Sequence, residues 1–203
     1  MPQRDVGIKT VKGGIVSIAA NDPTPKIIAF RYNPSALKRE LQPQMVGGEE
    51  GDRSIAVRFT GAPVQTINIE VELDASDQLG AGDSNAEQYG LLPQLATLEL
   101  LIYPTSQQIN QMQAQLNNGI MEVGPLIAPR TLFVWGSKRT LPVRLGSYSI
   151  NEEIFDSALR PIRATVTLSM RVLTYLDVDA SNPDYNQFMA YQQTLESMAA
   201  TIS

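Results

Sequence analysis

One segment near the end of the chain limits the possible folds more than any other. In residues 162–172 apolar side chains alternate with polar ones, and this period of two is typical of a β-strand with one buried face. At about 3.3 Å per residue the strand spans more than about 30 Å, which is long for a compact domain. Its length predicts a sheet that extends beyond the core of one subunit.

Further segments with a period of two complete an antiparallel sheet. Residues 67–73 place apolar side chains on one face, while Glu70 and Glu72 lie on the opposite, solvated face. Within residues 141–150 the apolar positions change parity at Gly146, which predicts a β-bulge and a bend in the strand. The remaining strands are expected at residues 6–8, 15–19, 26–32, 55–59 and 131–135.

Helical spacing predicts three helices. The main one covers residues 85–103, where Pro93 either kinks it or marks a second start. A Gln/Asn-rich segment, residues 106–118, predicts a short second helix. Asn182 as the N-cap and Pro183 as the first helical residue begin a terminal helix.

Two amino acids that are absent from the chain exclude much catalytic chemistry. With 0 His and 0 Cys there is no imidazole base, no thiolate nucleophile, no Ser-His-Asp triad and no thiolate zinc site. The formal charge of −5 argues against broad binding to nucleic acid or anionic lipid. The N-terminal residues form no apolar signal-peptide core, and no segment has the roughly 18 apolar residues of a membrane span. We therefore expect a soluble, non-enzymatic protein without a cofactor, a signal peptide, a membrane insertion or a nucleic-acid partner.

Two groups of carboxylates are candidates for metal binding or catalysis. Asp74, Asp77 and Asp83 share one segment, but their spacing does not match a calcium-binding loop, so a solvated loop is favoured. A carboxylate hydrolase needs an Asp or Glu with a raised pKa in a cleft, and nothing else in the chain indicates such a cleft. The second group, for which an exposed turn is favoured, comprises Glu152, Glu153 and Asp156. We therefore assign no catalytic residue and no metal ligand.

Charged and aromatic residues are candidates for contacts between subunits. Alternating charge on a long strand serves either a polar sheet face or the pairing of subunits. The terminal helix has an apolar stripe, which either packs on its own chain or docks onto an adjacent protein. The interface candidates are Glu70, Glu72, Arg163, Arg171, Phe188, Tyr191 and Leu195.

Several short segments follow one another in a fairly specific order and spacing. They are residues 28–35 (IAFRYNPS), 59–61 (FTG), 67–74 (INIEVELD), the helix at 95–101, 132–136 (LFVWG), 147–150 (SYSI) with Phe155, and 161–168 (PIRATVTL). Together they resemble the tube-protein family of contractile injection systems, the phage-tail-like particles of bacteria. The resemblance covers most of the chain as far as Thr174. The chain departs from it in three places: too little sequence follows Thr174 for the LysM domain that is often attached, residues 106–118 look like an insertion, and Ala158-Leu159 replaces a Gly-containing turn.

The resemblance implies a tail-tube-like, mainly β fold of the α+β class. Residues 1–175 would form an antiparallel β-sandwich or barrel with one flanking helix, and residues 176–203 a connector and a C-terminal helix. It also implies a homohexameric ring. Family members near the spike are similar to tube initiators or baseplate adaptors, so the expected partners are the spike hub protein, the inner tube protein and other baseplate proteins.

The particle implied by this resemblance assembles in the cytoplasm and is then released or membrane-associated. Other functions stay open. The chain is alternatively an inner tube layer or a tail terminator of the same particle. A small-ligand-binding β-barrel also shows alternating strands with a helix, and it predicts a closed monomer with an apolar pocket.

Overall fold

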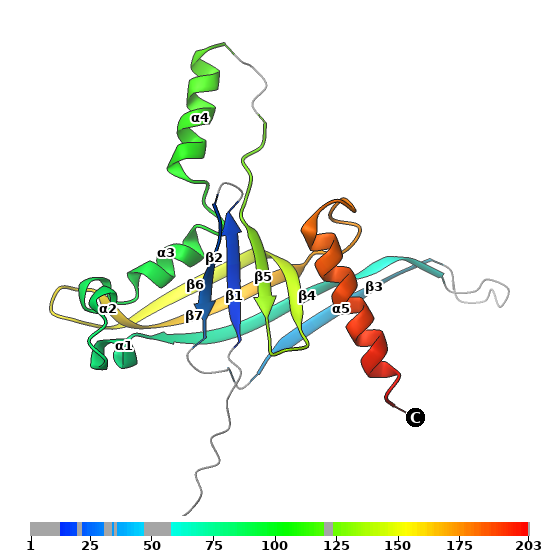
Figure 1. Ribbon diagram of the computed structural model, residues 1–203, viewed down its shortest axis with the longest axis horizontal. Coiled ribbons are helices and arrows are strands. Elements are labelled where there is room, and N and C mark those ends of the chain that lie inside the picture. The colour runs from blue at the N-terminus through cyan, green and yellow to red at the C-terminus, as the bar shows by residue number, and fades with distance from the viewer. Residues whose placement is uncertain are drawn as a thin grey trace, which may run out of the picture.

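The structure, a computed structural model, describes residues 13–19, 22–30, 34, 36–46, 58–119 and 124–202. Within these residues the fold is α+β and mainly β, as predicted, with a seven-stranded antiparallel sheet and five helices (Figure 1). The strands are β1 (Gly14–Ala19), β2 (Asp22–Ala29), β3 (Lys38–Val46), β4 (Arg58–Asp74), β5 (Arg130–Val134), β6 (Thr140–Phe155) and β7 (Pro161–Val172). The helices are α1 (Ser76–Gly80), α2 (Ser84–Tyr89), α3 (Leu92–Glu99), α4 (Ser106–Asn117) and α5 (Pro183–Ala199).

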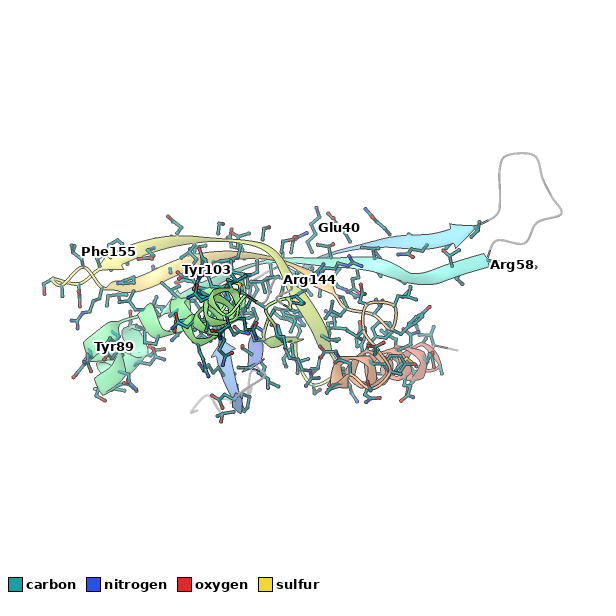
Figure 2. All side chains as sticks on the ribbon, turned by 90° about the horizontal axis from the view of Figure 1, so that it is seen from above. Glu40, Arg58, Tyr89, Tyr103, Arg144 and Phe155 are labelled. Atoms are coloured by element: carbon teal, nitrogen blue, oxygen red, sulfur yellow. The ribbon has the colours of Figure 1, made fainter. Side chains whose placement is uncertain are left out.

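The sheet folds over itself in two layers. Its strand order is β2-β1-β5-β6-β7-β4-β3, and each neighbouring pair is antiparallel. The long strands β6, β7, β4 and β3 form an extended layer that we call the blade. Figure 2 shows the shorter strands and the helices on one side of the blade, with no described element covering the other side. The arrangement is that of a sandwich whose edge strands are β2 and β3.

The core lies between the blade and the layer of shorter strands. One continuous cluster of buried side chains joins both layers, including Ile67, Val71, Val166 and Leu168 from the blade and Ile15, Phe30 and Phe133 from the other side. Burial of each such side chain stabilises the fold by roughly 1.5–3 kcal/mol. Trp135 is partly buried against this core, with its ring 5.9 Å from that of Phe133.

The predicted bulge at Gly146 is present in β6. The register with β7 shifts between Leu145 and Ser147, so Leu145 and Tyr148 both pack against the core despite their opposite parity. Figure 2 shows β6 bending near Arg144. One strand therefore belongs to both layers, because residues 140–143 pair with β5 and the rest extends along β7 in the blade.

Two strands differ from the prediction. Phe59 and Ile67 lie on the single 17-residue strand β4, because β3 accommodates Gly61 by two register shifts and the pairing continues. Strand β3 is missing from the prediction, since both of its faces are largely exposed and no period of two marks it. Residues 6–8, 31–32 and 55–57 of the predicted strands lie outside the described residues.

The helix expected at residues 85–103 is two helices. Gly90, with a φ of 58°, ends α2, and the N–H of Leu91 then donates to the carbonyl of Pro161 at 2.9 Å. Pro93 lies in the first turn of α3, where its missing N–H has no helical partner to lose, so it marks the second start. Residues 76–80, expected as part of a loop, form α1.

The other two helices agree with the prediction. Thr105 and Gln108 form a capping box at α4: the Thr105 hydroxyl accepts from the backbone N–H of Gln108 at 3.3 Å, and the Gln108 side chain accepts from that of Thr105 at 2.9 Å. Asn182 caps α5 by accepting from the N–H of Asp184 at 2.9 Å. Figure 1 shows α4 projecting past the β6 side of the blade and α5 ending past the β3 side.

Candidate assembly interface

The uncovered side of the blade is polar across its central part. The strand register arranges its side chains in rows: Asn151, Thr165 and Glu72; then Ser149, Thr167 and Glu70; then Ser147, Ser169 and Asn68. The alternate residues of the same strands, such as Val71 and Val166, are buried on the opposite side. Glu70 and Glu72, both predicted interface residues, therefore lie in a solvated face whose rows contain no apolar side chain.

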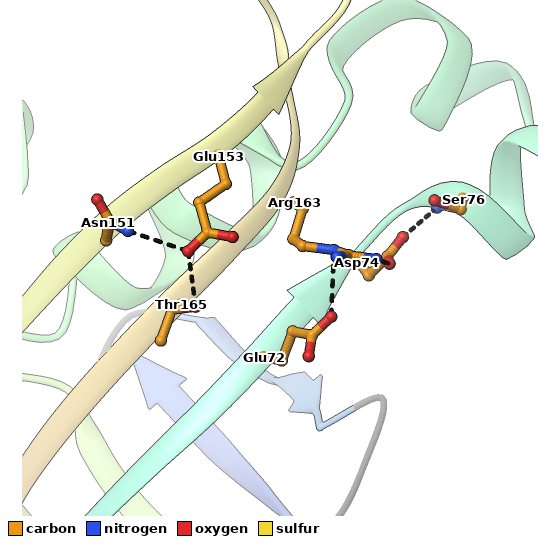
Figure 3. Close-up of polar contacts among 7 residues, drawn as sticks. All are labelled: Glu72, Asp74, Ser76, Asn151, Glu153, Arg163 and Thr165. Atoms are coloured by element: carbon orange, nitrogen blue, oxygen red, sulfur yellow. Dashed lines mark hydrogen bonds and ion pairs between the residues drawn. The ribbon is translucent and has the colours of Figure 1, made fainter.

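Arg163 binds two carboxylates of β4 at one end of this polar face (Figure 3). Its Nη2 lies 3.1 Å from Oδ2 of Asp74, and its Nε lies 3.2 Å from Oε1 of Glu72. The buried Asp74 carboxylate also accepts a 2.7 Å hydrogen bond from the backbone N–H of Ser76. The hydrogen bond to Asp74, followed by the charge of Glu72, raises the pKa of Arg163 above its ordinary value. Arg163 therefore joins β7 to β4 within its own chain.

Arg171 also has a partner in its own chain. Its Nη2 lies 2.8 Å from Oδ1 of Asp177. The other oxygen of Asp177 accepts from the backbone N–H and the hydroxyl of Thr174, both at 2.9 Å. This contact ties the end of β7 to the connector before α5. Both predicted interface arginines are thus paired inside the subunit and remain partly accessible on its surface.

Both long edges of the blade lack a strand partner among the described residues. β5 pairs only with residues 140–143 of β6, so residues 144–155 have β7 on one side and no described strand on the other. Among the described strands, β3 has β4 as its single partner. No proline interrupts residues 144–155, whereas the edge strand β2 contains Pro25, which lacks a backbone donor. The edge of β6 therefore presents a continuous row of backbone groups to which a strand of another chain can bind, and β3 presents such groups on either side of Pro43, which lacks a backbone donor.

The end of β6 and the turn that follows it expose apolar side chains on a strained backbone. Leu159 is 81% exposed and Ile154 is 58% exposed, and their φ angles are 60° and 43°. A side chain in this left-handed region costs roughly 1–2 kcal/mol. Asp156 holds the turn by accepting from the backbone N–H groups of Ala158 and Arg160, at 2.8 and 2.9 Å. Neither Leu159 nor Ile154 is among the contact residues predicted from the sequence, although Leu159 in place of a turn glycine was a signal.

The first half of α5 packs on its own chain. Tyr191 is 5% exposed, and its hydroxyl accepts from Nη2 of Arg39 at 3.4 Å. Leu195 is partly buried against the same core, and the ring of Phe188 lies 6.0 Å from that of Tyr175. The sequence leaves open whether this stripe packs on its own chain or docks onto an adjacent protein. Tyr191 packs within its own subunit.

Members of both groups of carboxylates have structural roles. Asp83 is the N-cap of α2 and accepts from the backbone N–H groups of Asn85 and Ala86, at 3.0 and 2.9 Å. The side-chain hydrogen bond from Arg160, followed by the one from its backbone N–H, lowers the pKa of Asp156 below its ordinary value of 3.8. In the part of the chain that the structure describes, no three carboxylates are grouped closely enough to hold a metal ion.

No protein-family model matches this chain, and no curated protein is significantly similar to it in sequence. None of the described helices has both the length and the apolar character that crossing a bilayer requires. The geometry of the blade and the order of the segments given above are therefore the features from which a function is inferred.

Proposed function

We propose that the chain is a ring-forming structural protein of a contractile injection system, a tube initiator or baseplate adaptor that connects the spike hub to the inner tube. Its partners in this proposal are further copies of itself, the spike hub protein, the inner tube protein and other baseplate proteins. The observation that carries the proposal is the blade, whose two long edges have no strand partner among the described residues. Backbone N–H and C=O groups in such edges form hydrogen bonds with strands of another chain.

The alternating strand directions favour closure into a ring. In the order β6-β7-β4-β3 every neighbour is antiparallel, so β6 and β3 run in opposite directions. When copies are related by rotation, the β3 edge of one copy meets the β6 edge of the next as an antiparallel pair. This heterologous contact closes when the rotation closes, as in the six-membered ring that the resemblance implies.

The polar face is suited to line a channel. The shorter strands and the helices all lie on the other side of the blade, where a ring leaves room for them on its outside (Figure 2). The Ser, Thr, Asn and Glu side chains of the polar face are hydrophilic. They offer no apolar patch to which a passing protein would adhere. A small-ligand barrel, in contrast, encloses an apolar pocket.

Electron microscopy and light scattering test the proposal directly. The full chain is purified alone and after co-expression with its genomic neighbours, and the particles are examined over a range of salt concentrations. We expect rings in at least one of these preparations. A chain that stays monomeric with every neighbour and binds a small molecule overturns the proposal in favour of the ligand barrel.

Two proline variants test the β6 edge. Successive residues of a strand direct their N–H groups to opposite sides, so of Asn151 and Glu152 one N–H faces β7 and the other faces the free edge. Both residues are exposed, so neither change removes buried surface. We expect one of Asn151→Pro and Glu152→Pro to lower the Tm, and the other to abolish rings with little change in Tm. Rings that persist in both variants contradict the proposal.

A further inference from the structure

The apolar stripe of α5 continues beyond the core that covers its first half. Along the stripe, Tyr191 is 5% exposed and Leu195 is partly buried, whereas Met198 is 41% exposed and Ile202, just past the helix, is 86% exposed. The spacing of these residues keeps them on one side of a helix. This end of α5 extends past the β3 side of the blade (Figure 1).

A cleft of about 240 Å³ lies where α4 leaves the body of the molecule. Its apolar floor and its glutamine wall are formed by Leu100, Tyr103, Ile127, Gln107, Gln108 and Gln111. Among the described residues that line it, Lys26 of β2 alone is charged. The cleft is smaller than the roughly 300–1,000 Å³ of a typical small-molecule site, so its size suits a few side chains of a protein segment.

We propose that the C-terminal half of α5 from a neighbouring copy occupies this cleft. Met198 and Ile202 of that copy lie against the apolar floor, and its Glu196 lies beside Lys26. The proposal gives a role to α4, in which no residue is buried. A twelve-residue helix is marginally stable without a packing partner, so a segment bound along its base would stabilise it.

Charge complementarity indicates a second copy as the occupant. Glu196 is the only charged residue after Asp184 in the chain, and Lys26 is the one charge in the described lining of the cleft. A single opposite pair at the edge of an apolar contact fixes its register more than its strength. The ends of the two helices also extend in opposite directions across the strands (Figure 1), so neighbours that join at the blade edges bring α5 of one copy towards α4 of the next.

This inference rests on the proposed ring, because strand pairing supplies the neighbour. Disulfide trapping tests it, and the absence of native cysteine makes the reaction specific. Gln111→Cys and Met198→Cys are made in separate chains, mixed before assembly and oxidised. We expect a covalent dimer from this mixture, since a disulfide forms only when the two Cα atoms approach within about 7 Å. The matched control mixes Gln111→Cys with Ser157→Cys, an exposed position in the turn between β6 and β7, and should give no dimer.

Charge exchange tests the polar contact. Lys26→Glu should weaken assembly about fivefold, and adding Glu196→Lys to the same chain should restore it. Lys138→Glu, in the exposed turn before β6, is the control and should leave assembly unchanged. The concentration dependence of light scattering measures all three variants. Equal effects of Lys26→Glu and Lys138→Glu, or no restoration, overturn the assigned contact.

The outcomes separate this inference from the proposed function. Rings without the dimer of Gln111→Cys and Met198→Cys chains overturn the helix contact and leave the ring standing. The dimer without rings supports the helix contact and overturns the ring. The absence of both overturns both.

Discussion

Arg163 lies at the end of the polar face, yet its charge is paired with Glu72 and Asp74 of the same subunit. Its partner Asp74 has a side chain that is only 3% exposed, so this carboxylate depends on the guanidinium for compensation. We expect Arg163→Glu to lower the Tm by several degrees, because it places a third carboxylate beside Asp74 and Glu72. Thermal unfolding followed by circular dichroism measures this.

Arg171→Glu is the matched control for Arg163→Glu. The partner of Arg171 is Asp177, whose side chain is more exposed than that of Asp74. It should lower the Tm less. An unchanged Tm in Arg163→Glu would mean that Asp74 is stabilised sufficiently by Ser76 and water.

Asp156 makes the turn between β6 and β7 sensitive to acid. Its hydrogen bonds from Arg160 lower its pKa below 3.8 in the folded state. A lowered folded-state pKa means that the group contributes stability above pH 3.8, and that this contribution is lost as the pH falls through the folded-state pKa.

We expect Asp156→Asn to destabilise the chain at neutral pH more than at acidic pH. The variant should have a lower free energy of unfolding than the unmodified chain at about pH 6, and the difference should shrink at about pH 3. Urea unfolding at the two pH values measures it. A difference that stays constant would contradict the assigned pKa shift.

At the scale of elements, the turn between β6 and β7 combines strain with exposure at Leu159. Glycine adopts a φ of 60° without the steric cost of a side chain. Because the Leu159 side chain is exposed, replacing it with hydrogen leaves no cavity in the core. We expect Leu159→Gly to stabilise the isolated chain by about 1 kcal/mol and to weaken assembly, because an exposed apolar residue on a strained backbone is a contact candidate.

Urea unfolding and light scattering measure the two effects of Leu159→Gly separately. Ala158→Gly is the control, since Ala158 has no positive φ and gains nothing from glycine. Stabilisation with unchanged assembly would show that Leu159 has no partner in the particle.

Gly90 determines how α2 and α3 meet the sheet. A Cβ at this position would lie 2.5 Å from the carbonyl oxygen of Pro161, and the φ of 58° already disfavours a side chain. We expect Gly90→Ala to lower the free energy of unfolding by about 2–4 kcal/mol. Gly80→Ala, with no atom within 4 Å of the added Cβ, should change it little, and urea unfolding compares the two. A similar stability in both variants would contradict the assigned close approach.

The sequence predicts elements well where one face is buried and the other is wet. β7 and the bulge in β6 follow from parity alone, and the start of α5 follows from Asn182 and Pro183. β3 leaves no such pattern because neither face is buried. The break between α2 and α3 is hidden because Leu91, which lies between them, continues the helical spacing of the buried Leu95 and Leu98 of α3, although Gly90 was a usable signal.

At the scale of the whole molecule, non-local pairing decides what a surface residue does. The strand period places Glu70, Arg163 and Arg171 on the polar face, and it does not show which carboxylates lie opposite the arginines. Likewise, the apolar stripe of α5 can be predicted from the sequence. Which of its residues are buried depends on how the helix packs against β6 and β3. Candidate interface residues can therefore be located from sequence, and their availability requires the fold.

The charge of the whole molecule predicts how assembly responds to salt. Each copy has a formal charge of −5, and the proposed ring would gather Glu70 and Glu72 of every copy around one channel. Salt shortens the screening length from about 10 Å at 0.1 M to about 3 Å at 1 M, which reduces this repulsion and leaves backbone hydrogen bonds between β6 and β3 largely unaffected. We expect ring formation to increase with NaCl, and Glu70→Gln to lower the salt that is needed. Light scattering against NaCl concentration measures both, with Glu87→Gln on α2 as a control of equal charge away from the polar face. Rings that dissociate as salt rises would mean that ion pairs between copies, and not strand edges, hold the assembly together.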